Sequence, residues 1–322
     1  MLLPILAFAD DILRDENYSK RLVKAIECSY RENFDRADSL LDILSQEADD
    51  SISIDFFKAT VWYSKMKDAE NFDEKDQLLD DMDRLQNAIG RIDSPDLKYR
   101  FIEGMISFYR ALIYVDTDGS MISAAMNLRH AASELAKASE DDILRPDAYL
   151  GLGTYKFFKS SKAGFLRSVM IISDERDEGI NMLRIAAKES RFGKWPAMHA
   201  LALAYADLEQ FEKTDSIVNV MRRLNPEGKT PLWDAIYVAE AKEDYEAVDT
   251  LAQELLNLIE EENGFNRIDV YYKMFIASKN NQENSKAEKY ARAALDIKAS
   301  SDAQKRQKNK IHEMEKFIAS RH

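Results

Sequence analysis

Residues 198–226, MHALALAYADLEQFEKTDSIVNVMRRLNP, decide the fold of this chain. Apolar and small side chains recur every three or four residues in this stretch, which is the period of an amphipathic helix. The pattern predicts one helix over 194–209 and a second over 211–224. Asn225-Pro226 ends the second helix, because proline cannot continue it. Two helices joined by so short a turn form an antiparallel hairpin.

Nine positions of this stretch have the spacing of the tetratricopeptide repeat, a helical hairpin of about 34 residues. They are Met198, Leu201, Ala202, Tyr205, Phe211, Thr214, Val218, Met221 and Pro226. The residues from Ala25 to Leu44 and from Tyr271 to Ala294 match the same spacing in part. The chain therefore resembles the tetratricopeptide repeat superfamily. This resemblance implies an all-α fold, a right-handed superhelical solenoid of antiparallel helix pairs, in a class of proteins that hold peptides or other proteins.

Helical periodicity continues along the rest of the chain and breaks at turn-forming residues. It predicts helix pairs at 11–31 and 33–48, 52–68 and 74–92, 95–115 and 119–139, 145–160 and 174–190, 231–241 and 244–262, and 266–280 and 284–298, with a final helix at 301–320. We expect one solenoid of about seven hairpins over 10–300, with an insertion at 159–173 and a C-terminal capping helix within 301–322. The alternation that is typical of strands is absent.

The net charge of −13 is unevenly distributed. Residues 1–145 hold 30 acidic and 18 basic side chains, so this part of the chain should repel nucleic acids and anionic lipids. The last 37 residues instead hold ten Lys and Arg against five acids. That run lacks interleaved aromatic residues, which favours the solvated face of a capping helix over a nucleic-acid site. The single cysteine, Cys28, excludes an intramolecular disulfide.

The first nine residues, MLLPILAFA, are uncharged and apolar. Ala7 and Ala9 resemble the small-residue cleavage site of a secretory signal, although the cationic start of such signals is missing. We expect a signal-peptide remnant at 1–9, a mature N-terminus at Asp10 and a periplasmic or exported protein. The alternative is a cytoplasmic protein whose apolar N-terminal turn docks on the first helix pair. No other stretch approaches the roughly 20 apolar residues of a membrane span.

A second resemblance is local. Residues 149–158, YLGLGTYKFF, and 174–180, DERDEGI, are similar to uncharacterised exported bacterial tetratricopeptide proteins and to the eukaryotic Iml2 and tetratricopeptide 39 family. Gly151 and Gly153 are expected to let two helices approach closely, with Gly179 at the small position of the second helix of the hairpin. Neither group of relatives implies a catalytic residue.

The side chains that would carry chemistry are scattered along the chain. His130, His199, His312 and His322 have no Cys, Asp or Glu at metal-ligand spacing. The sequence contains neither a phosphate-binding glycine loop nor a nucleophile elbow. We therefore expect a non-enzymatic protein without a metal or cofactor, which acts as a scaffold or adaptor for a protein or peptide partner.

The register of the repeat predicts which side chains line a concave groove. They are Tyr155, Lys156, His199, Leu203, Trp233, Tyr237, Tyr272 and Ile276. A ladder of aromatic rings offers large and rigid contact area, which suits a peptide or a partner helix. The alternative is that the superhelix closes and these rings pack on one another or on the insertion.

Two other functions remain open from the sequence. A closed superhelix would hold a small amphipathic or lipid-like ligand over Phe157, Phe158 and Phe165. An envelope hydrolase, or its accessory subunit, is the alternative from another class. The apolar stretch at 157–172 also suits a peripheral membrane contact, but we favour a short helix buried in the groove or against the next hairpin, because lone apolar runs are usually buried.

Overall fold

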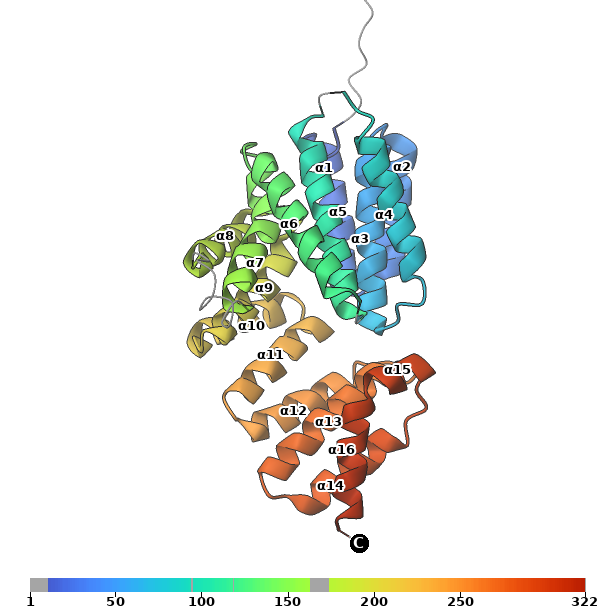
Figure 1. Ribbon diagram of the computed structural model, residues 1–322, viewed down its shortest axis with the longest axis vertical. Helices are drawn as coiled ribbons and strands as arrows, with labels where there is room; N and C mark the ends of the chain where they lie inside the picture. Colours follow the sequence, from blue (N-terminus) through green and yellow to red (C-terminus); the bar gives the residue numbers. More distant parts are fainter. Residues whose placement is uncertain (1–10, 94, 118, 163–173, 322) are drawn as a thin grey trace, which may run out of the picture. The chain divides into compact units, whose positions relative to one another are not determined.

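The computed structural model describes residues 11–93, 95–117, 119–162 and 174–321 (Figure 1). The expected signal-peptide remnant at 1–9 and most of the insertion, with Phe165, lie outside these residues. In the described ranges the fold is all-helical, as predicted, with sixteen helices and no strand. The chain divides into two compact units, Met1–Leu201 and Ala202–His322, and the boundary falls within α9 (Lys194–Asp207).

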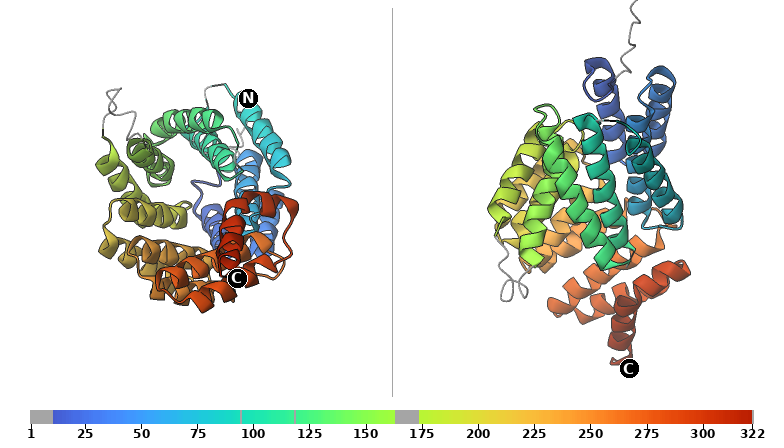
Figure 2. Two further views of the ribbon diagram at one scale, coloured as in Figure 1. Left: turned by 60° about the horizontal axis from the view of Figure 1, so that its bottom comes forward. Right: turned by 45° about the horizontal axis from the view of Figure 1, so that its top comes forward.

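The first unit is built from helices that pack on their neighbours in the chain (Figure 2). They are α1 (Glu16–Tyr30), α2 (Phe34–Glu47), α3 (Ser51–Ala69), α4 (Lys75–Ile89), α5 (Leu97–Asp116), α6 (Met121–Ala138), α7 (Arg145–Lys162) and α8 (Arg176–Glu189), followed by the start of α9. The most extensive contacts join α5 to α6 and α7 to α8, and the paired helices run antiparallel. The predicted helix pairs are therefore confirmed.

Glycines let α7 and α8 approach each other closely, as predicted. A Cβ atom on Gly179 would lie 2.7 Å from the backbone nitrogen of Phe157 and 2.8 Å from the carbonyl oxygen of Gly153. Real Cβ atoms do not come so near to backbone atoms, so only glycine fits this crossing.

Five turns between successive helices share one backbone geometry. Each holds a residue other than glycine in the left-handed conformation, namely Glu32, Glu70, Glu209, Glu243 and Gln282, with φ between 49° and 62°. The next residue donates its N–H back into the preceding helix, for example from Gln210 to the Tyr205 carbonyl at 2.8 Å. This bond satisfies a carbonyl that the helix end leaves free. The same turn recurs from hairpin to hairpin, as expected for a repeat protein.

The second unit has its own core. It contains the end of α9, then α10 (Phe211–Leu224), α11 (Lys229–Ala241), α12 (Tyr245–Leu256), α13 (Gly264–Asn280), α14 (Asn284–Leu295), α15 (Ser301–Arg306) and α16 (Lys308–Ala319). Ile236 of α11, Phe275 of α13 and Met314 of α16 are fully buried in this core. α16 packs on α13 and α14 and thereby covers the apolar side of their hairpin.

Two helix boundaries differ from the predicted ones for local reasons. α1 begins at Glu16 rather than at residue 11, because the Asp15 carboxylate accepts two backbone N–H groups of the first turn and caps the helix there. α12 ends at Leu256 rather than at residue 262. Ile259 continues the apolar period of the sequence, but it lies buried in the turn that follows α12. Its carbonyl accepts a hydrogen bond from the Arg267 guanidinium at 3.2 Å.

The final predicted helix, over 301–320, is broken into α15 and α16 at Gln307. The Gln307 side chain is buried, and its amide donates to the Phe265 carbonyl at 3.3 Å. A buried amide must find a partner, and this contact with the start of α13 accompanies the break in the helix.

Candidate partner-binding surfaces

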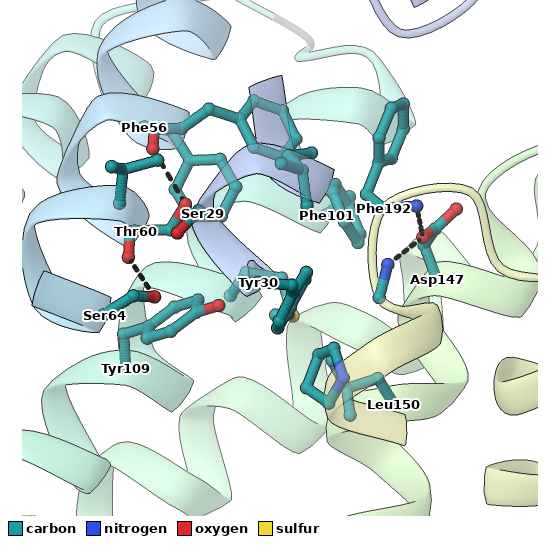
Figure 3. A pocket seen from close by; sticks show the side chains of 16 residues that line it. Ser29, Tyr30, Phe56, Thr60, Ser64, Phe101, Tyr109, Asp147, Leu150 and Phe192 are labelled. Atoms are coloured by element: carbon teal, nitrogen blue, oxygen red, sulfur yellow. Dashed lines mark hydrogen bonds between the residues drawn. The ribbon is translucent and has the colours of Figure 1, made fainter. Parts of the chain in front are cut away.

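Aromatic rings fill the space between α1, α3, α5 and α7 in the first unit (Figure 3). They are Tyr30 of α1, Phe56 and Phe57 of α3, Phe101 and Tyr109 of α5, and Phe192 of the loop before α9. Several pack edge to face, as Phe56 does on Phe101 with ring centres 6.5 Å apart. Burial raises the pKa of Tyr109 to about 12. The remaining cavity measures about 30 Å³, which holds two water molecules at most, so this region is a core rather than a groove.

Asp147 of α7 holds the loop that closes this core. Its carboxylate is 1% exposed and accepts the backbone N–H groups of Phe192 at 2.7 Å and Gly193 at 2.9 Å, together with the Ser190 hydroxyl. Burial raises the pKa of Asp147, and these hydrogen bonds act in the opposite direction. The carboxylate thus supplies the acceptor for the buried N–H of Phe192, and it shares the N–H of Gly193 with the Ser190 hydroxyl, which accepts it at 2.7 Å.

The same loop and the first turn of α9 contact α1, the first helix of the unit. The Arg191 guanidinium donates to the Ser19 hydroxyl at 3.1 Å, and Trp195 stacks on Tyr30 with ring centres 6.1 Å apart. The first unit therefore closes on itself between its first helix and the loop before α9. The closed alternative considered from the sequence concerned the rings of the predicted ladder, and these contacts involve none of them.

Three of the eight predicted groove residues lie in the first unit, and none lines the aromatic cavity. Lys156 of α7 pairs with Glu178 of α8 at 2.7 Å and so joins the two helices of one hairpin. The Tyr155 ring lies 5.1 Å from the ammonium of Lys159, one turn further along α7. His199 is half-buried on α9.

The other five lie in the second unit. Leu203 is half-buried on α9. Trp233 of α11 is half-buried and packs against the second core, whereas Tyr237, one turn later, is 44% exposed. Tyr272 and Ile276 of α13 also pack against that core.

An ion pair joins α11 to α13 beside these rings. Lys273 and Glu240 meet at 2.7 Å. Glu240 lies one turn after Tyr237, and Ile276 lies one turn after both Lys273 and Tyr272. The contact therefore brings Trp233, Tyr237, Tyr272 and Ile276 to neighbouring faces of two helices, here named the α11–α13 surface.

α16 occupies part of the region around Tyr272. The Tyr272 hydroxyl donates to the Glu313 carboxylate at 2.6 Å, and the Lys310 ammonium lies 5.6 Å from the centre of the ring. Burial raises the pKa of Tyr272, and the bond from Tyr272 lowers the pKa of Glu313. Tyr237 is thus the most accessible ring of the α11–α13 surface.

Sequence reasoning missed a hollow of about 890 Å³ between α2 and α4, with α3 as its floor. We name it the α2–α4 groove. Its lining is Asp38 and Asp42 from α2, Ser51, Ile52, Asp55, Lys58, Ala59, Trp62 and Lys65 from α3, Glu74 before α4, and Asp81, Arg84, Leu85 and Ala88 from α4. The available signal was the spacing of Asp35, Asp38 and Asp42, which places three acids on one helical face.

The part of the chain that the structure describes has neither a metal site nor a helix that could span a membrane. No three His, Cys, Asp or Glu side chains gather there in a way that would hold a metal ion. Among the same residues, every helix is too short or too polar to cross a bilayer.

No protein-family profile and no curated protein matches this chain. Among solved structures, the chain is similar to the C-terminal part of a TPR repeat-containing protein from Cytophaga hutchinsonii, with 16% identity and a TM-score of 0.44, over 89% of this chain and 97% of that one. It is also similar to PilW, described as a widely conserved type IV pilus biogenesis factor, with 12% identity and a TM-score of 0.46, over 80% of this chain and 99% of that one.

Proposed function

We propose that this chain is a non-enzymatic scaffold or adaptor that binds a peptide or a helix of a partner protein on the α11–α13 surface. One contrast supports the proposal. The space between α1, α3, α5 and α7 is filled by the chain's own rings, whereas Tyr237 leaves 44% of its surface exposed. Tyrosine and tryptophan are enriched among the residues that dominate the energy of protein interfaces.

The surroundings of Tyr237 suit such a contact. Trp233, one turn earlier on the same helix, packs against the second core, which holds its ring in place. A ring that is already ordered loses little conformational entropy when a partner binds. The Lys273–Glu240 ion pair lies beside the rings and gives the surface a polar edge.

The described residues favour a protein partner over a lipid-like ligand. Phe157 is fully buried, with its ring edge-on to Phe158 at 5.1 Å and its backbone against Gly179. The aromatic cavity of the first unit, at about 30 Å³, has no room for an alkyl chain.

The proposal places the scaffold in the bacterial cell envelope. This part rests on Ala7 and Ala9 alone. N-terminal sequencing of the native protein is its test. A native chain that begins at Asp10 supports export, and one that begins at Met1 overturns it.

Affinity capture tests the partner-binding role. The full chain serves as bait in envelope and soluble extracts of the source organism, and the bound proteins are quantified by mass spectrometry. We expect a protein that is retained by the wild type and lost with Tyr237→Ala. Because Tyr237 is exposed, the variant should keep the wild-type thermal stability.

Leu224→Ala is the matched control, because Leu224 is 43% exposed on α10 and lies outside the α11–α13 surface. Loss of the captured protein with both variants, or with neither, contradicts the proposed contact. Trp233→Ala is less suitable as a binding variant, since truncating a ring packed on the core should itself lower stability by about 2 kcal/mol or more.

A further inference from the structure

We propose that the α2–α4 groove is a docking site for a cationic amphipathic helix of a partner protein. The inference deepens the proposed scaffold role and rests on it, but it concerns other helices than the α11–α13 surface. Both the shape of the groove and its charge support this occupant.

The floor of the groove has the length and the composition of a helix-binding surface. It runs along α3 from Ser51 to Lys65, a rise of about 21 Å at 1.5 Å per residue, which equals about four turns of a bound helix. Ile52 and Trp62, which are both half-buried, supply apolar contact area on this floor. An amphipathic helix binds in such a groove through side chains spaced one turn apart.

The walls are acidic, and their charges are incompletely balanced. The lining holds five carboxylates and three cations, within a segment, residues 34–89, that holds 15 acids and six basic side chains. Asp42 pairs with Lys58 at 2.7 Å, and Arg84 pairs with Asp81. Within the described residues, Asp38 and Asp55 take part in no ion pair.

Asp38 is the better placed of these two acids. Partial burial raises the pKa of its carboxyl group, and the charge of Lys65 acts against that shift. A carboxylate that has lost part of its hydration without gaining an ion pair gains more from an incoming ammonium or guanidinium than a fully exposed one does. Asp55 is exposed on the floor between Ile52 and Ala59.

Trp62 provides a fixed anchor at the other end of the floor. Its indole N–H donates to the Glu74 carboxylate at 2.9 Å, which holds the ring in place between α3 and the start of α4. Carboxylates on both walls therefore flank a floor on which Ile52 and Trp62 are interspersed with the charged Asp55, Lys58 and Lys65. This is the complement of a helix with Leu or Ile along one face and Lys or Arg on either side of it. The same charge repels nucleic acids and anionic lipid surfaces.

The test uses a fluorescently labelled, end-capped peptide of 18 residues, with Leu along one helical face and Lys along the other, and the full-length chain at low salt. A peptide with Glu in place of every Lys is the charge control. We expect the cationic peptide to bind and the anionic one not to bind. Hydrogen exchange should slow in α2, α3 and α4 when the cationic peptide is present.

Two double variants with the same change in charge locate the site. Asp38→Lys with Asp55→Lys alters the groove, and Asp76→Lys with Asp80→Lys alters exposed acids of α4 that do not line it. We expect about tenfold weaker binding with the first pair and at most about twofold with the second. Circular dichroism establishes that both remain helical.

Each contrary outcome overturns the groove proposal. Equal weakening by the two double variants indicates general attraction to an acidic surface, and equal binding of the anionic peptide rules out charge recognition. No binding of the cationic peptide at low salt also rejects the site. If Tyr237→Ala weakened the binding of the cationic peptide, the peptide would be bound on the α11–α13 surface and not in the groove. The two proposals can also fail separately. If Tyr237→Ala loses the captured partner and the cationic peptide does not bind, the scaffold role still holds and only the groove proposal is rejected.

Discussion

The backbone N–H of Phe192 donates to the Asp147 carboxylate at 2.7 Å, and this bond fastens the loop before α9 onto α7. Gly193 donates to the same carboxylate at 2.9 Å. Asp147→Ala would leave the Phe192 N–H buried without an acceptor and the Gly193 N–H with the Ser190 hydroxyl alone, so we expect a loss of about 2 kcal/mol in the free energy of unfolding, measured with urea. Asp142→Ala is the control, because that side chain is 87% exposed, and it should change stability by less than about 0.5 kcal/mol. A fully stable Asp147→Ala protein would show that this carboxylate does not close the first unit.

The crossing of α7 and α8 gives a second prediction. Gly179→Ala would place a Cβ atom 2.7 Å from the Phe157 backbone nitrogen, so the two helices must separate, and we expect a loss of about 2 kcal/mol or more. Gly90→Ala is the matched control. A Cβ atom there meets nothing nearer than 3.4 Å, and the backbone φ of −63° suits alanine. Chemical denaturation should show unchanged or slightly higher stability for Gly90→Ala. Equal effects of the two substitutions would argue against a close helix crossing at Gly179.

The recurrent turn predicts a stabilising change. Glu243 has φ of 58°, a left-handed conformation that glycine adopts freely and that strains a glutamate. Glu243→Gly relieves that strain but adds freedom to the unfolded chain, so we expect a net gain of about 0.5 kcal/mol. Glu246→Gly, three residues later in the first turn of α12, should instead lose about 1 kcal/mol. Thermal unfolding of the two variants distinguishes them, and a loss of stability with Glu243→Gly would contradict the left-handed assignment.

Arg14 gives a prediction about pH. Its guanidinium pairs with Asp96 at 2.9 Å, and this hydrogen bond holds the pKa of Asp96 below its usual value. A carboxyl group whose pKa is lower in the folded state stabilises the fold above its unfolded pKa of about 3.9 and loses that effect as the pH falls through the folded pKa. The difference in stability between wild type and Arg14→Gln should therefore be largest near neutral pH and shrink below about pH 4. A difference that stays constant from neutral to acidic pH would mean that Arg14 acts through packing.

The helices were predictable from sequence because their pattern is local. Asn225 caps α10 at its C-terminus, where the proline signal placed the end. The role of Asp147 could not be predicted in this way. Its sequence neighbours indicate only an acid in the first turn of a helix, and the groups that it binds lie more than 40 residues later in the chain. The register of the repeat predicted the same groove position for Trp233 and Tyr237. In the structure Trp233 packs against the second core and is half-buried, whereas Tyr237 is exposed.

The α2–α4 groove was unpredictable for a related reason. Helical periodicity places Asp38 and Asp55 on particular faces of their helices. It does not say whether another helix covers those faces. That depends on how three helices pack, and the groove exists because α2 and α4 leave a strip of α3 open between them.

Hydrogen exchange of the full chain, with and without its captured partner, tests the scaffold account most directly. If the partner binds the α11–α13 surface, backbone amides of Lys229–Ala241 and Gly264–Asn280 should exchange more slowly in the complex. Amides of α7, which carries the buried Asp147, should exchange as in the free protein. Unchanged exchange in α11 and α13, with slowing confined to other helices, would contradict the account.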